Sequence, residues 1–176
     1  MVNFALPLFA LGMAASIAAS PVADTTFSFS AWVEDIIANP DTALSADEAV
    51  DAAIAAANVT NSGNLLSKRL NCDPPGFRPA PARDAAACVE DLARKGRSGI
   101  DCVIPAGQSN IQMCRIGNAV IVGSRADSAR QSANCNDVAR AIGFVFDSCY
   151  RPQDDTVKGS EIVPTNNRMQ ANVNRA

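Results

Sequence analysis

The distribution of cysteine is the feature that most limits what this chain can fold into. The sequence has six cysteines, all after residue 71, and no histidine. An even number of cysteines in a short segment is typical of a disulfide-stabilised domain from an oxidising compartment. The alternative is a metal site, but the chain has no CxxC pair and no histidine to supply the usual zinc ligands. We therefore expect three disulfides and neither a metal nor a cofactor. The cysteines are Cys72, Cys88, Cys102, Cys114, Cys135 and Cys149.

The N-terminus has the pattern of a secretory signal. The apolar run over residues 4–15 is too short to span a bilayer stably, and Ser16-Ile17-Ala18 is a small-x-small cleavage site. The alternative is an uncleaved N-terminal anchor. No later stretch approaches the roughly 20 apolar residues that a spanning helix needs. We expect a signal peptide over residues 1–18, an extracellular protein and no stable membrane span.

Charge divides the exported chain at a dibasic pair, Lys68-Arg69. Residues 19–69 hold seven acidic and two basic residues, a net charge of −5, whereas residues 70–176 hold eleven acidic and thirteen basic residues, a net charge of +2. The pair ends a Ser/Gly/Asn-rich stretch that predicts an accessible loop. Such a site is typical of cleavage by a kexin-like protease, and the alternative is a linker that stays intact. We expect a mature domain of residues 70–176, released from a pro-segment of residues 19–69.

The pro-segment contains one clear helix signal. Ser45 and Glu48 have the spacing of a capping box, and the alanine-rich run after them favours a helix with little bulk to bury. Asn58 begins an Asn-x-Thr sequon and is a predicted glycosylation site. The acidic pro-segment is expected to shield the mildly basic domain or to assist its folding.

Apolar periodicity predicts two helices in the mature domain, over about residues 83–95 and 134–149. A first strand ends at Cys72, before a stiff proline-rich arm. Strand patterns occupy four further segments, residues 99–105, 111–124, 156–163 and 168–174. The second of these is either one longer strand or a hairpin whose two-residue turn is Gly117-Asn118. The order predicts an α+β fold, a split β-α-β-β-α-β sandwich with two helices packed on one face of an antiparallel sheet.

The expected layout brings some cysteines together and keeps others apart. Cys135 and Cys149 are fourteen residues apart on one helix. They are therefore separated by roughly 21 Å and cannot bond each other. Six cysteines allow fifteen pairings in principle. With the helices side by side and neighbouring strands in contact, the layout favours Cys72–Cys149, Cys88–Cys135 and Cys102–Cys114.

The residue types give little support to catalysis. Without histidine, the chain lacks Ser-His-Asp and Cys-His nucleophilic systems. Two carboxylate pairs, Glu90-Asp91 and Asp154-Asp155, keep a small carbohydrate-active enzyme as an alternative, although solvated surface charges are the simpler interpretation. The chain has no Gly-rich phosphate loop, and its few aromatic residues and mixed charges are poor support for nucleic-acid binding. We expect no enzyme activity.

Phe144 does not fit the pattern of a purely structural helix. At about 100° per residue, it lies opposite the buried stripe of the helix over 134–149. It either packs beneath the proline-rich arm around Phe77 or is an exposed partner contact, with Arg140 and Arg151 nearby.

These features together resemble a known family. A signal, an acidic pro-segment ending in Lys-Arg and six cysteines over β-α-β-β-α-β resemble fungal secreted effectors of the killer-toxin-like α/β-sandwich type. The segment ANCNDVARAIGFVFDSC, Ala133–Cys149, is similar to cysteine-flanked helices of fungal small secreted proteins. The resemblance implies a non-enzymatic effector or toxin-like protein that binds a protein or cell surface of a host or competitor. A further alternative is a protease inhibitor that presents residues 73–81.

Overall fold

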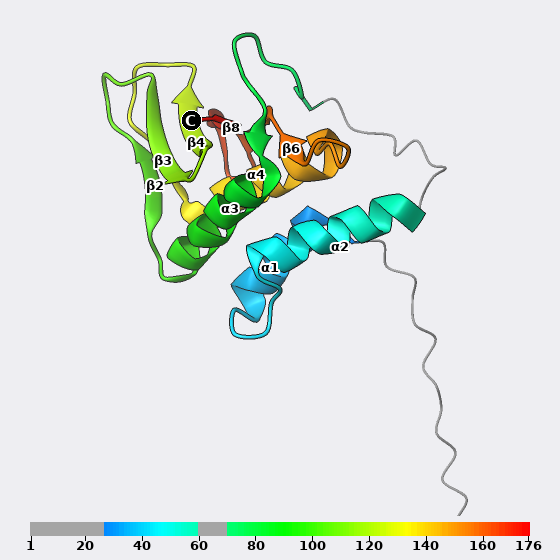
Figure 1. Cartoon of the computed structure of the whole chain (residues 1–176). Helices are drawn as coiled ribbons and strands as arrows, with labels where there is room; N and C mark the ends of the chain where they lie inside the picture. The colour runs from blue at the N-terminus through cyan, green and yellow to red at the C-terminus, as the bar shows by residue number, and fades with distance from the viewer. Residues whose placement is uncertain (1–26, 60–69) are drawn as a thin grey trace, which may run out of the picture.

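The computed structural model describes residues 27–59 and 70–176, which form three layers (Figure 1). Strands form one outer layer, helices α3 and α4 the middle layer, and helices α1 and α2 the other outer layer. We call residues 70–176 the body, and α1 with α2 the helical pair. The predicted signal peptide of residues 1–18 and the Lys68-Arg69 pair lie outside the described residues.

The main sheet has four antiparallel strands in the order β3-β4-β8-β7. Its strands are β3 (Asn110–Ile116), β4 (Ala119–Arg125), β7 (Gly159–Val163) and β8 (Asn166–Arg175). The predicted turn at Gly117-Asn118 is confirmed, since it joins β3 to β4. Along β4, Ala119 and Ile121 are buried and alternate with half-buried residues, so one face of the sheet carries the core.

Helices α3 (Ala82–Arg97) and α4 (Cys135–Cys149) pack against each other and on one face of this sheet. Both run close to their predicted bounds. Their apolar residues recur at helical spacing, and Leu92 and Ile142 are fully buried at the centre of the two stripes. The predicted α+β sandwich, with two helices on one face of an antiparallel sheet and three disulfides, is therefore confirmed.

Two short ribbons complete the strand layer. Strand β2 (Asp101–Ile104) pairs with β5 (Gln131–Asn134), and β1 (Ala80–Pro81) pairs with β6 (Thr156–Val157). The sequence did not predict β5, because QSAN has neither alternation nor β-branched residues. The expected first strand at Cys72 is reduced to one bridge between Asn71 and Ser160, since the proline-rich arm that follows has few N–H donors for a ladder.

The disulfides confirm one predicted pair and correct two. Cys72 is bonded to Cys149, as predicted, with Cα atoms 5.2 Å apart. The predictions Cys88–Cys135 and Cys102–Cys114 were wrong, because the structure pairs Cys88 with Cys114 and Cys102 with Cys135. Helix α3 packs on β3, so Cys88 faces the sheet instead of α4. Strand β5 pairs with β2 and continues into α4, which places the first residue of α4 beside Cys102.

The helical pair is the third layer. Helix α1 (Phe29–Ala38) buries Phe29, Trp32, Val33 and Ile36, which are spaced so that they share one face. Helix α2 (Ala46–Val59) begins at the predicted capping box, which is confirmed: Ser45 N donates to Glu48 Oε2 at 2.8 Å, and Glu48 N donates to Ser45 Oγ at 3.4 Å. Figure 1 shows both helices on the side of α3 that faces away from the strands.

Candidate binding surface

Helix α1 lies on a face of α4 that carries Arg140, Gly143 and Asp147. The spacing of these three residues places them on one side of the helix. Gly143 permits a close approach: a Cβ atom there would lie 3.2 Å from Ser30 Cα and 3.2 Å from Val33 Cγ2. Helix α1 therefore buries Gly143 and half-buries Arg140, while Asp147 stays exposed beside the contact, and a side chain larger than glycine at position 143 would crowd it.

Arg140 forms a two-point ion pair with α1. Its Nε donates to Glu34 Oε1 at 2.6 Å, and its Nη2 donates to Glu34 Oε2 at 2.9 Å. Its Nη1 donates to Asp137 Oδ1 at 2.8 Å on α4 itself. The hydrogen bonds from Arg140 hold the pKa of Glu34 below its ordinary value of 4.5 and raise the pKa of Arg140. The geometry is the bidentate one that arginine forms with carboxylates.

Asp147 caps the first turn of α1 from the body. Phe29 N donates to its Oδ1 at 2.6 Å, and Ser30 N donates to its Oδ2 at 3.0 Å. These N–H groups have no acceptor within their own helix, and the positive end of the helix dipole favours an anion there. Beside this cap, the Phe29 ring packs on Phe146 with centroids 4.4 Å apart and on Tyr150 at 5.7 Å.

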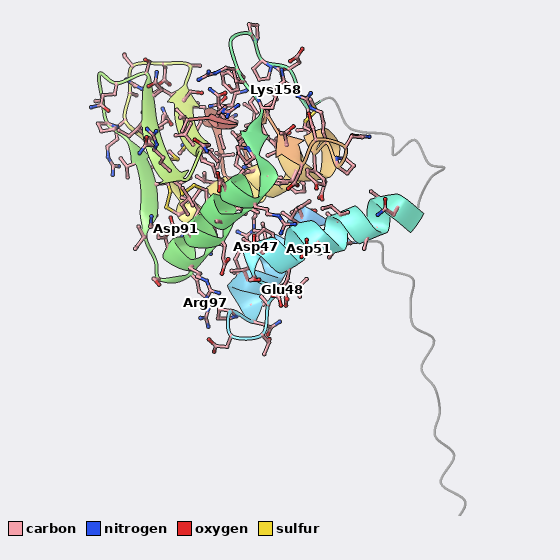
Figure 2. The ribbon with its side chains drawn as sticks, viewed as in Figure 1. Asp47, Glu48, Asp51, Asp91, Arg97 and Lys158 are labelled. Carbon is pink, nitrogen blue, oxygen red and sulfur yellow. A yellow bond between two sulfur atoms is a disulfide. The ribbon has the colours of Figure 1, made fainter. Side chains whose placement is uncertain are left out.

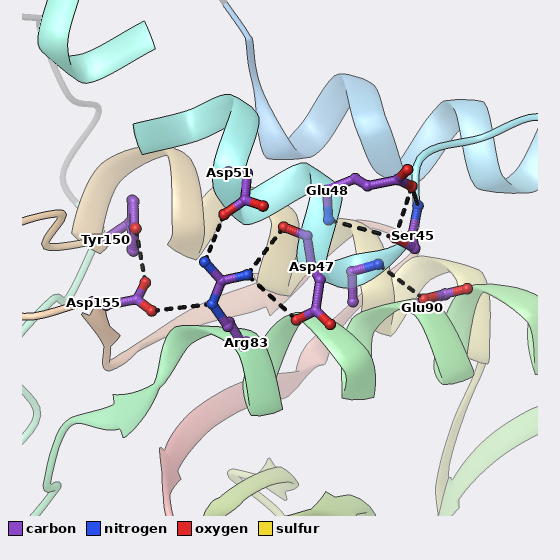
Figure 3. Close-up of polar contacts among 9 residues, drawn as sticks. Ser45, Asp47, Glu48, Asp51, Arg83, Glu90, Tyr150 and Asp155 are labelled. Atoms are coloured by element: carbon purple, nitrogen blue, oxygen red, sulfur yellow. Dashed lines mark hydrogen bonds and ion pairs between the residues drawn. The ribbon is translucent and has the colours of Figure 1, made fainter. Parts of the chain in front are cut away.

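Helix α2 contacts α3 through a second arginine. Arg83 Nη2 donates to Asp51 Oδ1 at 2.6 Å, and Nη1 lies 3.5 Å from Asp47 Oδ1 (Figure 3). The hydrogen bond to Asp51 raises the pKa of Arg83. Glu90, also on α3, accepts a hydrogen bond from Ala46 N at 3.2 Å, at the start of α2. Figure 2 shows Asp47 and Asp51 on α2 beside α3.

Arg83 also reaches the turn after α4. Its Nε lies 3.6 Å from Asp155 Oδ2, and Tyr150 Oη donates to Asp155 Oδ1 at 2.9 Å (Figure 3). The pKa of Tyr150 is raised above its usual range, mainly because the phenol is buried and, to a smaller extent, because it donates a hydrogen bond to Asp155. Asp155 has φ +48°, a left-handed conformation that Asp tolerates better than most residues. The cluster is a set of satisfied ion pairs that joins α2, α3 and the turn.

A groove of about 390 Å³ lies beside the face covered by α1. Phe144 of α4 and Ile162 of the edge strand β7 both line it and are 44% and 43% exposed. Leu70, the first residue of the body, also lines the groove, as do the carboxylates of Asp147 and Glu161. Because Asp147 belongs to both, the groove is continuous with the face under α1.

The structure separates the residues predicted to act with Phe144. The Phe144 side chain is 44% exposed and lines the groove, and Phe77 of the proline-rich arm is not among the residues that line it. Arg140 is engaged by Glu34, which sequence reasoning did not connect to it. Arg151 is exposed and pairs through its backbone with Thr156, outside the groove lining.

The predicted carboxylate pairs are occupied by other contacts. Glu90 pairs with Arg94, and Asp91 pairs with Lys95, each one helical turn away. Asp154 accepts from Thr156 Oγ1 at 2.7 Å, while Asp155 belongs to the Arg83 cluster. Asn58 is exposed in the last turn of α2, and Thr60 of its sequon lies outside the described residues, so glycosylation stays a prediction.

Sequence reasoning missed Arg83, Gly143 and Asp147 as interface residues. One signal for them was present in the sequence. Residues 27–59 contain six acidic and no basic residues, so any ion pairs that these carboxylates form must be with basic residues elsewhere in the chain. Among the described residues, no cluster of three or more His, Cys, Asp or Glu is arranged to hold a metal ion. Within the same ranges, no helix has the length and hydropathy to cross a membrane.

The fold and its surface define a three-disulfide α+β sandwich domain whose helical layer is covered by an acidic pair of N-terminal helices. A family model described as a domain of unknown function (DUF8794) matches residues 67–175. The chain belongs to this family. The match spans the body and leaves out both α1 and α2. Comparison with curated proteins and with solved structures found no significant match.

Proposed function

We propose that this chain is the precursor of a secreted, non-enzymatic binding protein that acts on a host or competing cell, in the manner of a fungal effector or toxin. Cleavage by a kexin-like protease after Arg69 releases residues 70–176 as the mature domain. The layout supports this division, because the three disulfides lie wholly within the body and the family match begins next to the dibasic pair.

The observation that carries a binding function is the exposed apolar groove beside α4. Phe144 from a helix and Ile162 from an edge strand both line it, and neither belongs to the buried core. An exposed phenylalanine next to an apolar groove is a favourable anchor for a partner, since aromatic side chains supply large contact areas at low entropic cost. The two carboxylates that line the groove accept hydrogen bonds from backbone N–H groups, Asp147 from Phe29 and Glu161 from Ile162.

Replacing Phe144 by Ser tests this function. Because the ring is largely outside the core, Phe144→Ser is expected to leave the melting temperature within about 2 °C and to weaken cell binding at least tenfold, as loss of an aromatic anchor does. Fluorescently labelled secreted protein, titrated onto plant protoplasts and fungal spheroplasts, measures the affinity. Ile100→Ser is the matched control, because Ile100 is 49% exposed and lies outside the groove. Equal binding by both variants would exclude Phe144 as the anchor.

The carbohydrate-active alternative has a separate readout. Release of reducing sugars from cell-wall polysaccharides by wild-type protein, and its loss in Asp154→Asn with Asp155→Asn, would favour an enzyme over a binding protein. Inhibition of proteases from a panel, abolished by replacing residues 73–81, would favour the inhibitor. We expect neither activity.

A further inference from the structure

The body binds the two helices of residues 27–59 with the same pattern of polar contacts twice. The first-turn N–H groups of α1 and α2 donate to a carboxylate of the body, Asp147 for α1 and Glu90 for α2. In the opposite direction, acidic side chains of each helix accept hydrogen bonds from an arginine of the body, Arg140 for α1 and Arg83 for α2. Each helix is thus held at its positive end and by its acidic side.

An apolar contact lies between these polar ones. Phe146 of α4 is 1% exposed, and the ring of Phe29 from α1 packs against it. Gly143 allows α1 to approach α4 closely, with Val33 against it. An apolar centre surrounded by oriented charge pairs is the usual anatomy of a protein–protein interface.

No covalent bond other than the peptide chain holds the helical pair on the body. Residues 27–59 contain no cysteine, and they contain six acidic and no basic residues. The body carries a net charge of +2 and all three disulfides. After cleavage at the dibasic pair, only the contacts described above would keep the helical pair in place, so that it would become an exchangeable ligand.

We propose that the outer face of α3 and α4 is a docking surface for an acidic amphipathic helix of a partner protein, and that residues 27–59 occupy it in the uncleaved chain. This inference rests on the proposed function, because it requires a released mature domain that acts by binding. The partner helix presents apolar residues at the spacing of Phe29, Trp32, Val33 and Ile36, a carboxylate for Arg140, and a free first turn for Asp147.

Cleavage changes how easily a partner competes for this surface. In the uncleaved chain the tethered helical pair has an effective concentration in the millimolar range. A free partner that binds the surface with the same affinity must reach a higher concentration than this to displace it. Once the chain is cut, the helical pair is diluted to its actual concentration and leaves the surface free. The surface under α1 then joins the groove at Phe144, because Asp147 contributes to both.

Peptide exchange on the full chain tests the docking surface. Purified chain, uncut or cut after Arg69 by a kexin-type protease, is titrated with a fluorescein-labelled peptide of residues 27–59, and anisotropy reports binding. The cut chain is expected to bind the peptide at least tenfold more tightly than the uncut chain. A peptide with Glu34→Lys is expected to bind the cut chain at least tenfold more weakly than the unmodified peptide.

Asp41→Lys is the matched peptide control. It changes the charge by the same amount at an exposed residue between α1 and α2 that forms no hydrogen bond or ion pair with any described residue. Its affinity is expected to stay within threefold of the unmodified peptide.

Four results would overturn the docking surface. The first two are that the cut chain does not bind the peptide, and that Glu34→Lys and Asp41→Lys weaken peptide binding equally. The other two are that the cut chain associates with itself instead of binding the peptide, and that it loses the circular dichroism spectrum of the folded protein after cutting. Peptide exchange in a protein that binds no cell would refute the proposed function alone. Cell binding without exchange would refute only this surface.

Discussion

Arg140 joins two layers of the molecule and part of the sheet through a single side chain. It pairs with Glu34 of α1 and with Asp137 of α4, and Asp137 in turn accepts from Thr165 Oγ1 at 2.7 Å in the turn before β8. By its spacing along α4, Arg140 lies on the side of the helix opposite the buried stripe, where a side chain is expected to face solvent. Its role in holding α1 therefore follows only from the position of α1 in the tertiary structure.

Glu34 makes the docking of α1 sensitive to pH. Because hydrogen bonds from Arg140 lower the pKa of Glu34 in the folded state below 4.5, its contribution is complete above pH 4.5 and is lost as the pH falls through the lowered value. Glu34→Gln removes this titration. We expect Glu34→Gln to reduce the free energy of unfolding of the uncut chain by about 1 kcal/mol at pH 7, a modest value because the pair is partly solvated.

Urea unfolding of the uncut chain between pH 3 and pH 7 measures this effect. The difference between wild type and Glu34→Gln is expected to shrink towards zero at the acidic end. Asp41→Asn is the control, since Asp41 is exposed, and its effect is expected to be small at every pH. A difference that stays constant from pH 7 to pH 3 would contradict the assigned role of the ionised carboxylate.

At the scale of elements, the β3–β4 hairpin is linked to α3 through its turn. Gly117 has φ +51°, and a Cβ atom there would lie 2.4 Å from Asp84 Oδ2. The same carboxylate oxygen accepts a hydrogen bond from Asn118 N at 2.8 Å. The turn therefore requires glycine for two reasons, its left-handed backbone and its contact with a helix.

Comparison with another glycine separates these two reasons. Gly107 has φ +85°, but apart from its two chain neighbours no residue has an atom within 4 Å of a Cβ built there. We expect Gly107→Ala to cost about 1–2 kcal/mol in the free energy of unfolding, from backbone strain alone. Gly117→Ala is expected to cost about 1 kcal/mol more, because the new methyl group displaces Asp84 from Asn118. Denaturant unfolding of the two variants measures both values, and equal costs would show that the Asp84 contact contributes nothing.

At the scale of the whole molecule, the disulfides and the proposed cleavage are tested together by intact mass. Secreted protein is expected to include a species of residues 70–176 whose mass is lower by two hydrogens for each of the three disulfides. Peptide mapping without reduction is expected to link Cys88 to Cys114. An uncut chain with free thiols would contradict the precursor model, and a peptide linking Cys88 to Cys135 would contradict the fold.

Much of the body follows from local pattern. The stripes of α3 and α4 and the Gly117-Asn118 turn are each encoded by residues close in sequence, because helix and hairpin formation depend on spacing and turn chemistry within a few residues. The capping box at Ser45 is of the same kind. One disulfide was also predictable, since Cys72 and Cys149 lie at ends of elements that the expected topology brings together.

The remaining features depend on contacts between distant segments. Strand β5 forms because β2 supplies its partner, and that pairing decides which cysteine meets Cys102. The position of α1 was also not predictable from the sequence. Its apolar stripe indicates that one face of the helix is buried, but not which surface of the body buries it. The face of α4 that it covers carries a glycine and charged residues, which in the sequence resemble an exposed face.

The sequence by itself determined the class of fold, the number of disulfides and the uneven division of charge, because each depends on residue type and local spacing. Only the tertiary structure decided which cysteines bond and which surface receives the acidic helices. Those outcomes depend on the relative placement of residues up to 119 positions apart, as in the contact between Ser28 and Asp147, and no local pattern records that placement.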